Sequence, residues 1–136
     1  MIKPIMKSEF FLRLPSEDAG PDDAATGQDL LDTLHEHERE CVGLAANMIG
    51  VRKRIICVKD GNRTLLMYNP QILEQVNAYQ TSEGCLSLID ERPCTRYRRI
   101  KVEYLDENFV HRIKNFSGYT AEIIQHEIDH CNGIVI

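Results

Sequence analysis

The segment that most constrains the fold of this 136-residue chain lies near its end, where an apolar helical stripe carries two histidines. Apolar residues recur three or four positions apart, which predicts an amphipathic helix from about Gly118 to His130. Ser117 stands at the expected capping position, and Asn132-Gly133 supplies a stop signal. The stripe consists of Ala121, Ile124, Ile128 and Cys131.

The same segment has the spacing of a metal site. His126 and His130 are four residues apart, so a helix places both imidazoles on one face, where they can chelate one ion. Glu127 follows the first histidine, and its carboxylate can reach a water on the metal instead of the metal itself. A metal lowers the pKa of such a water, and the carboxylate then accepts its proton during attack on a carbonyl group. The alternative is an exposed helix face with two unrelated histidines, but the enclosed glutamate and the apolar stripe favour a metal site.

A third metal ligand must come from upstream of the helix. Only six residues follow His130, and the side chain of Cys131 projects about 100° around the helix from its neighbour. Cys57 lies in an apolar run and is better explained by core packing. The candidates are Cys41, Cys57, Cys85, Cys94, His35, His37 and His111.

Cys85 is the candidate with the most suitable surroundings. It follows Gly84, which permits an unusual backbone conformation, and precedes Leu86, whose N–H can lie beside the metal. Two histidines and one cysteine leave a fourth position for water, as in catalytic metal sites. We therefore expect Cys85, His126 and His130 to hold the ion.

The rest of the chain predicts one further helix and several short strands. Leucines recur at helical spacing between Gln28 and Glu40, and the strands alternate with turn signals at Gly61-Asn62 and Asn69-Pro70. A helix, several strands and a final helix predict an α+β fold in one domain, residues 1–136. The expected strands are 54–58, 64–68, 71–76, 100–104 and 109–113.

Composition excludes several other classes of protein. The net charge of −5 argues against a nucleic-acid partner, because polyanions favour clustered cations. A local group of cations (Arg96, Arg98, Arg99 and Lys101) is better explained as a solvated sheet edge than as a binding patch. The sequence contains no apolar run of about 18 residues, so we expect no membrane span. The N-terminus also lacks the apolar core of a signal peptide, and we therefore expect a cytoplasmic protein. Its five cysteines are then expected as thiols or metal ligands.

Three segments in order resemble the motifs of the peptide deformylase family. Glu83-Gly-Cys-Leu-Ser87 looks like the second motif, and Gln125-His-Glu-Ile-Asp-His130 looks like the third. Val42-Gly-Leu-Ala-Ala-Asn-Met48 is similar to the first, with two departures. Cys41 stands where the family has its first glycine, and Met48 stands where it has glutamine.

The resemblance implies antiparallel sheets packed around the metal helix and removal of the N-formyl group from formyl-methionyl nascent peptides, met at the ribosome. It implies one divalent ion, Fe(II) first, with Zn or Ni as alternative occupants, in a chain that we expect to be a monomer. Glu127 would be the general base and acid, and the Leu86 N–H would help to hold the oxyanion. Val42, Gly43 and Gly84 would bind the peptide backbone, with Arg92 at a position where the family often has arginine.

The departure at Met48 keeps two alternatives open. The family's glutamine donates a hydrogen bond to the formyl oxygen, whereas methionine has no donor. One alternative is a degenerate relative that binds metal and peptide with little turnover. The other is a metal hydrolase for a different amide.

Overall fold

The computed structural model describes residues 1–136 and contains one five-stranded antiparallel sheet, whose strands follow one another in chain order. This arrangement confirms the predicted α+β class with antiparallel strands around a C-terminal helix. The helices are α1 (Glu9–Leu12), α2 (Ala24–Glu36) and α3 (Gly118–Cys131), with 3-10 turns η1 (Pro21–Asp23) and η2 (Ala46–Ile49). The strands are β1 (Gly43–Ala45), β2 (Ile55–Asp60), β3 (Arg63–Glu83), β4 (Arg92–Leu105) and β5 (His111–Ser117).

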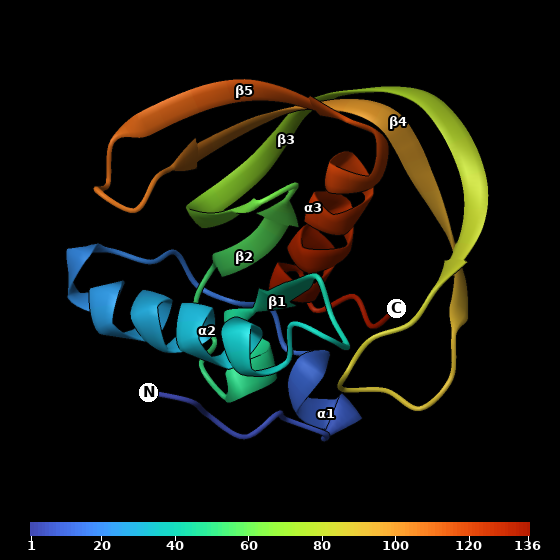
Figure 1. Ribbon diagram of the computed structural model, residues 1–136. Coiled ribbons are helices and arrows are strands. Elements are labelled where there is room, and N and C mark those ends of the chain that lie inside the picture. Colours follow the sequence, from blue (N-terminus) through green and yellow to red (C-terminus); the bar gives the residue numbers. More distant parts are fainter.

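Helix α3 occupies the middle of the molecule, with β3, β4 and β5 curving over it and with β1 and β2 beside it (Figure 1). Ser117 is its N-cap residue but makes no side-chain capping bond, contrary to the capping role expected for it. The Thr120 hydroxyl instead donates to Asp60 of β2 at 2.9 Å. At the other end, a Cβ atom on Gly133 would lie 2.5 Å from the carbonyl oxygen of Arg13, so the chain can leave the helix there only as glycine.

Helix α2 begins and ends about four residues earlier than the leucine spacing predicted. Leu30 and Leu34 are buried as expected, but the helix starts at Ala24 directly after η1. Position 27, inside this helix, requires glycine, because a Cβ atom there would be 2.1 Å from the Tyr68 hydroxyl oxygen. The residues after Glu36 form the connection to β1 and reach the cavity described below.

The turn expected at Asn69-Pro70 is a bulge within one long strand. Asn69 has a φ of 54°, and the register with β4 shifts between Tyr68 and Gln71. Its side chain accepts from the Ala19 N–H at 2.7 Å and donates to the Ala19 carbonyl at 2.9 Å. Asparagine tolerates the left-handed conformation, so the strand continues where a turn was predicted, and 64–68 and 71–76 join in β3.

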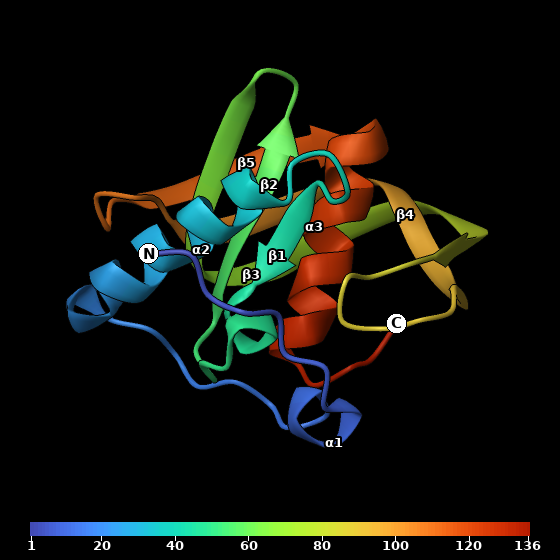
Figure 2. The same cartoon turned by 60° about the horizontal axis from the view of Figure 1, so that its bottom comes forward.

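One apolar core draws on both ends of the chain. Its 24 buried residues include Leu12 of α1 and Cys131 at the end of α3, and it also contains Cys57, as predicted. In the view of Figure 2, in which the bottom of Figure 1 is turned forward, the N-terminal segment crosses the molecule before entering α1. None of the helices has the length and apolarity needed to cross a lipid bilayer.

Candidate metal centre and active-site cavity

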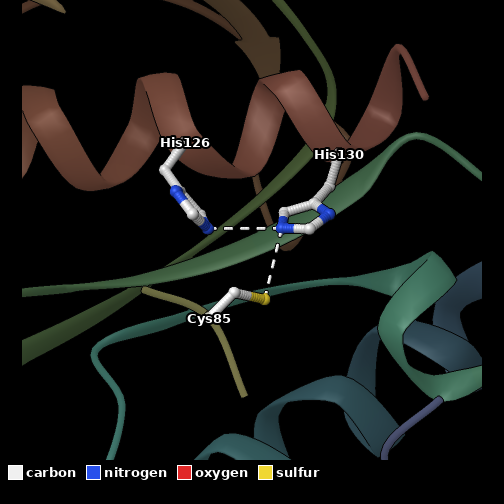
Figure 3. A group of neighbouring side chains, drawn as sticks. All are labelled: Cys85, His126 and His130. Atoms are coloured by element: carbon white, nitrogen blue, oxygen red, sulfur yellow. Dashed lines mark hydrogen bonds between the residues drawn. The ribbon is translucent and has the colours of Figure 1, made fainter. Parts of the chain in front are cut away.

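Cys85, His126 and His130 converge on one point, as the sequence predicted (Figure 3). Their ligand atoms all lie within 4.8 Å of one another. The His130 Nε2 atom is 3.2 Å from His126 Nε2 and 3.4 Å from Cys85 Sγ. Two atoms bound to one tetrahedral ion at about 2.0–2.3 Å lie roughly 3.3–3.7 Å apart, so the observed separations suit a shared ion.

The chemistry of these three side chains also fits a transition metal. One sulfur and two imidazole nitrogens are ligands that Zn, Ni and Fe accept. The His126 Nδ1 atom is 2.8 Å from Glu83 Oε1, so its proton is held there and Nε2 is left for a metal. His130 is fully buried, and burial, with His126 and Arg96 as positive neighbours, lowers its pKa to about 3. A ring that stays neutral at pH 7 is ready to coordinate.

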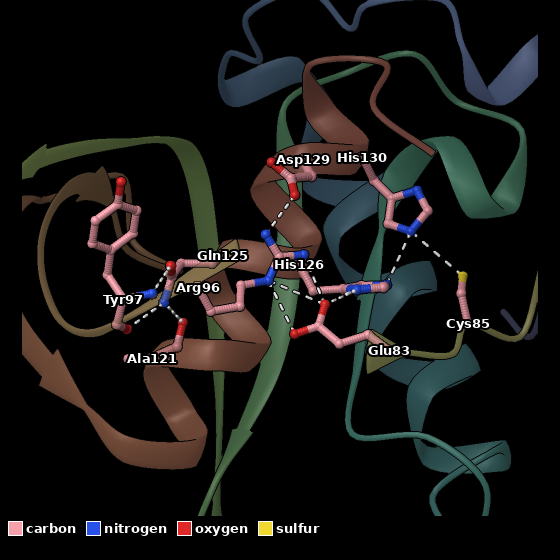
Figure 4. A network of polar contacts seen from close by, with 9 residues as sticks. All are labelled: Glu83, Cys85, Arg96, Tyr97, Ala121, Gln125, His126, Asp129 and His130. Carbon is pink, nitrogen blue, oxygen red and sulfur yellow. Dashed lines mark hydrogen bonds and ion pairs between the residues drawn. The ribbon is translucent and has the colours of Figure 1, made fainter. Parts of the chain in front are cut away.

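A buried network of ion pairs connects the cluster of Cys85, His126 and His130 to the sheet (Figure 4). Arg96 of β4 donates to both carboxylate oxygens of Glu83, at 2.7 to 3.1 Å, and to Asp129 at 2.7 Å. Burial would raise the pKa of Glu83, but hydrogen bonds from His126 and Arg96 hold it well below its usual value. The network therefore keeps a carboxylate against His126, the first of the two histidines expected to bind the metal.

Arg96 is a correction to the interpretation of the basic group as a solvated sheet edge. It is only 4% exposed, while Arg98 and Arg99 are exposed as expected. The sequence showed alternation along this strand but not which side of the sheet α3 would cover. Next to Arg96, the Gln125 side chain accepts from the Tyr97 N–H at 2.8 Å and donates to the Tyr97 carbonyl at 2.9 Å, which fixes α3 on β4.

The cluster of Cys85, His126 and His130 borders a cavity of about 600 Å³. Three segments enclose it: the connection from α2 into β1, the end of β3 with the loop that follows, and one face of α3. His126 and Cys85 line this cavity. Six other predicted site residues also line it, namely Val42, Gly43, Met48, Gly84, Leu86 and Glu127.

The carboxylate of Glu127, a residue of α3, lies close to strand β1 at Gly43. A Cβ atom on Gly43 would be 2.7 Å from Ile123 Cγ2 and 2.9 Å from Glu127 Oε2. Glycine is therefore required at this position of β1 if the carboxylate is to stay in place. Glu127 is 4% exposed, and its Oε1 atom is buried without a hydrogen-bond partner.

The protonation of Glu127 suits proton transfer near neutral pH. Burial raises the pKa of this carboxyl to about 7, against the opposing effect of His126. A general base is most effective when its pKa is close to the working pH. Burial would lower the pKa of His126, but Cys85 and Glu83 raise it to about 10, so a metal ion has to displace a proton from this ring.

Comparison with known proteins identifies the family. The sequence profile of the family described as Polypeptide deformylase matches residues 6–136. A protein named Peptide deformylase from Clostridium beijerinckii is 52% identical over 136 residues and is covered completely, as is this chain. The chain belongs to the peptide deformylase family. The resemblance in the three sequence motifs is thereby confirmed, as is the enzyme class that it implied.

Solved deformylase structures share the whole fold. A Met-Ala-Ser-bound class I type b peptide deformylase from Acinetobacter baumannii has a TM-score of 0.87 at 31% identity, over 99% of this chain and 97% of that one. Peptide deformylase from Thermotoga maritima has a TM-score of 0.89 at 28% identity, over 99% and 95% of the two chains. Deformylase activity that depends on a metal is supported. The two alternative hypotheses, a degenerate binding protein and a hydrolase for another amide, are not favoured.

Met48, one departure from the first deformylase motif, is almost fully buried and still borders the cavity. Its exposed fraction is 1%, and its Sδ atom accepts from the Ala45 N–H at 3.5 Å. Cys41, the other departure, also lines the cavity. Burial, with Glu127 as a charged neighbour, raises the pKa of the Cys41 thiol to about 12. Cys41 and Met48 therefore change the wall of the cavity, and the cluster of Cys85, His126 and His130 is still complete.

Arg92 does not line the cavity. Its guanidinium group pairs with Glu9 of α1 at 2.5 Å and donates to the Val135 carbonyl at 3.2 Å, so it joins both ends of the chain to β4. The supporting residues Glu83, Arg96 and Asp129 were not proposed from the sequence. A glutamate directly before the Gly-Cys pair was the available signal for Glu83. Its partner Arg96 on β4 carries no local signal, because it lies thirteen positions after Glu83 in the sequence.

Proposed function

We propose that this deformylase removes the N-formyl group from the N-terminal formyl-methionine of newly made polypeptides, with one divalent ion held by Cys85, His126 and His130. The observation that carries the proposal is the convergence of one cysteine and two histidines beside a cavity of about 600 Å³, which Cys85 and His126 of the cluster line. The same cavity is lined by a buried carboxyl group, Glu127, that is not part of the ligand cluster.

Each group in this cavity has a separate task in the proposed reaction. A divalent ion in the cluster would lower the pKa of water and polarise the formyl carbonyl. Glu127 accepts the proton of the attacking water at its carboxylate and later delivers it to the leaving amine. The N–H of Leu86 has no acceptor within the chain, so it is free to donate to the oxyanion.

Strand β1 is the proposed docking edge for the peptide. It is the first strand in the sheet order and pairs only with β2, so its other edge can add an extended peptide by backbone hydrogen bonds. Val42 and Gly43, at the start of this strand, and Gly84, after β3, all line the cavity. We assign no peptide contact to Arg92, whose charge is already paired.

Fe(II) is the proposed native ion, with Zn and Ni as alternative occupants. The set of one thiolate and two imidazoles accepts all three. We also infer that the enzyme meets nascent chains at the ribosome in the cytoplasm and acts as a monomer. A single chain supplies every group of the proposed site, which supports the monomer.

The proposal is tested by steady-state hydrolysis of formyl-Met-Ala-Ser, with protein purified without oxygen and reconstituted with Fe(II), Ni(II) or Zn(II). We expect release of formate in proportion to bound metal, with the Fe(II) and Ni(II) forms active and the Fe(II) form losing activity faster in air, because Fe(II) and the thiolate are oxidised. Metal-loaded protein that releases no formate would exclude deformylation. Equal decay of the Fe(II) and Ni(II) forms would remove the argument for iron.

Met48→Gln should raise the turnover number by at least about tenfold with a smaller change in KM. The added amide donates to an oxyanion more strongly than to a neutral carbonyl, and one such donor typically contributes about 10²–10³ in rate. The new carbonyl oxygen can accept the Ala45 N–H that now contacts Met48 Sδ, and the cavity lies beside it. Kinetics and thermal melting should be measured together.

Met67→Gln is the matched control, because Met67 is fully buried and does not line the cavity. An unpaired amide there should cost about 1–3 kcal/mol of stability and leave turnover of the folded protein unchanged. Suppose that metal-loaded Met48→Gln is stable, that wild type already has a high turnover number, and that the variant does not exceed it. Another group then already supplies the donor to the oxyanion.

A further inference from the structure

The N-terminal arm, residues 1–8, connects two segments that border the active-site cavity. The Met6 N–H donates to the Met48 carbonyl at 2.7 Å. The ammonium group of the next residue, Lys7, donates to the Leu86 carbonyl. Met48 and Leu86 both line the cavity, so two consecutive residues of the arm hold two of its walls. The arm crosses the molecule in Figure 2 between its start and α1.

The Leu86 carbonyl belongs to a peptide group that also contacts a proposed metal ligand. The N–H of this peptide group is that of Ser87, and it lies 3.4 Å from Cys85 Sγ. A cation on the carbonyl oxygen polarises the peptide group and strengthens the hydrogen bond made by its N–H. Hydrogen bonds to a ligating sulfur reduce the electron density that the sulfur gives to its metal.

The loop that carries this peptide group packs on the core through Leu86 but has few other hydrogen bonds. Within residues 84–91 there is one backbone hydrogen bond, from Leu88 N to Cys85 O at 3.1 Å. Ser87 is buried, whereas the side chain of Ile89, two residues further along the loop, is fully exposed. Lys7 therefore supplies, from outside the loop, a hydrogen bond to the carbonyl of the peptide group between Leu86 and Ser87.

We propose that Lys7 is a positioning residue of the metal centre, which holds the Leu86–Ser87 peptide group so that its N–H points at the Cys85 sulfur. The inference rests on the proposed role of Cys85 as a metal ligand. Through this peptide group the ammonium charge makes the thiolate a weaker electron donor, and it also orients the neighbouring Leu86 N–H in the cavity.

The test uses full-length protein loaded with Co(II), because a thiolate–Co(II) pair gives a charge-transfer absorption band that reports on the sulfur directly. Lys7→Met removes the charge and retains most of the length of the side chain. We expect its band to move to longer wavelength, because a sulfur that has lost its hydrogen bond gives up an electron more easily. The turnover number should fall about three- to tenfold with KM nearly unchanged, less than the largest losses known for groups that support metal ligands.

Two further variants make the result specific. Lys3→Met removes the same charge from the same arm, but the Lys3 Nζ atom faces Asp29 at 4.0 Å, so its band and turnover should match wild type. Lys7→Arg retains a cationic donor and should return the band towards its wild-type position. Identical spectra and turnover for Lys7→Met and Lys3→Met would overturn the role of Lys7. A wild-type Co(II) protein with no thiolate band would instead contradict the ligand role of Cys85, and with it the proposed metal site.

Discussion

Glu127→Ala is expected to retain its metal and to lose turnover of formyl-Met-Ala-Ser by about 10²-fold or more, the scale of general base catalysis. The carboxyl group is buried beside the ligand cluster but is not one of its three members. Its Oε1 atom has no partner within the chain, and burial raises its pKa to about 7. A group in this state can take up and release a proton without breaking a structural hydrogen bond.

Metal content and kinetics must be measured on the same preparation of this variant. Glu40→Ala is a suitable control, because Glu40 also lines the cavity but has a side chain that is 61% exposed. We expect near wild-type turnover from it. Loss of metal in parallel with activity in Glu127→Ala would make Glu127 a ligand or a structural support, and the proposed proton transfer would be wrong.

Arg96→Met should lower the free energy of unfolding by about 3–5 kcal/mol, the usual cost of removing one partner from a buried ion pair. The Arg96 side chain is 5% exposed, and its partners Glu83 and Asp129 are 9% and 20% exposed. Without the guanidinium group, two carboxylates remain close together in a poorly solvated space. Urea unfolding followed by circular dichroism measures the difference directly.

Arg98→Met is the matched control for this loss of charge. Arg98 lies two residues along β4, exposed, with its guanidinium carbon 4.7 Å from the centre of the Tyr79 ring. A cation over an aromatic ring at an exposed site contributes about 0.5–1 kcal/mol. Equal urea midpoints for Arg96→Met and Arg98→Met would show that the buried network gives no net stability and serves only to orient His126.

Local spacing in the sequence was sufficient to predict which side chains come together in the candidate metal site. Two histidines on one helical face, and a cysteine beside a glycine, are determined by neighbours in the chain, and the structure brings all three together. The length of β3 could not be predicted in the same way. Asn69 and Pro70 are turn residues by local preference, and only the contact of Asn69 with Ala19 turns them into a bulge.

The residues that support the site were beyond prediction because their partners are distant in the chain. Arg96 lies in an alternating strand in which the buried side depends on where α3 packs. Lys7 reaches Leu86 across 79 positions of sequence. Both are long cationic side chains, which are solvated in most contexts, and nothing in their own neighbourhood marks them as exceptions.

The ligand role of Cys85 is the central claim, and metal content after dialysis, measured by plasma mass spectrometry, tests it most directly. We expect one ion per chain in wild type and in Cys94→Ser, because Cys94 lies outside the ligand cluster. Cys85→Ser should retain far less metal, since a neutral hydroxyl replaces the soft thiolate ligand. Equal metal content in Cys85→Ser and wild type would contradict the assignment of Cys85 to the metal site.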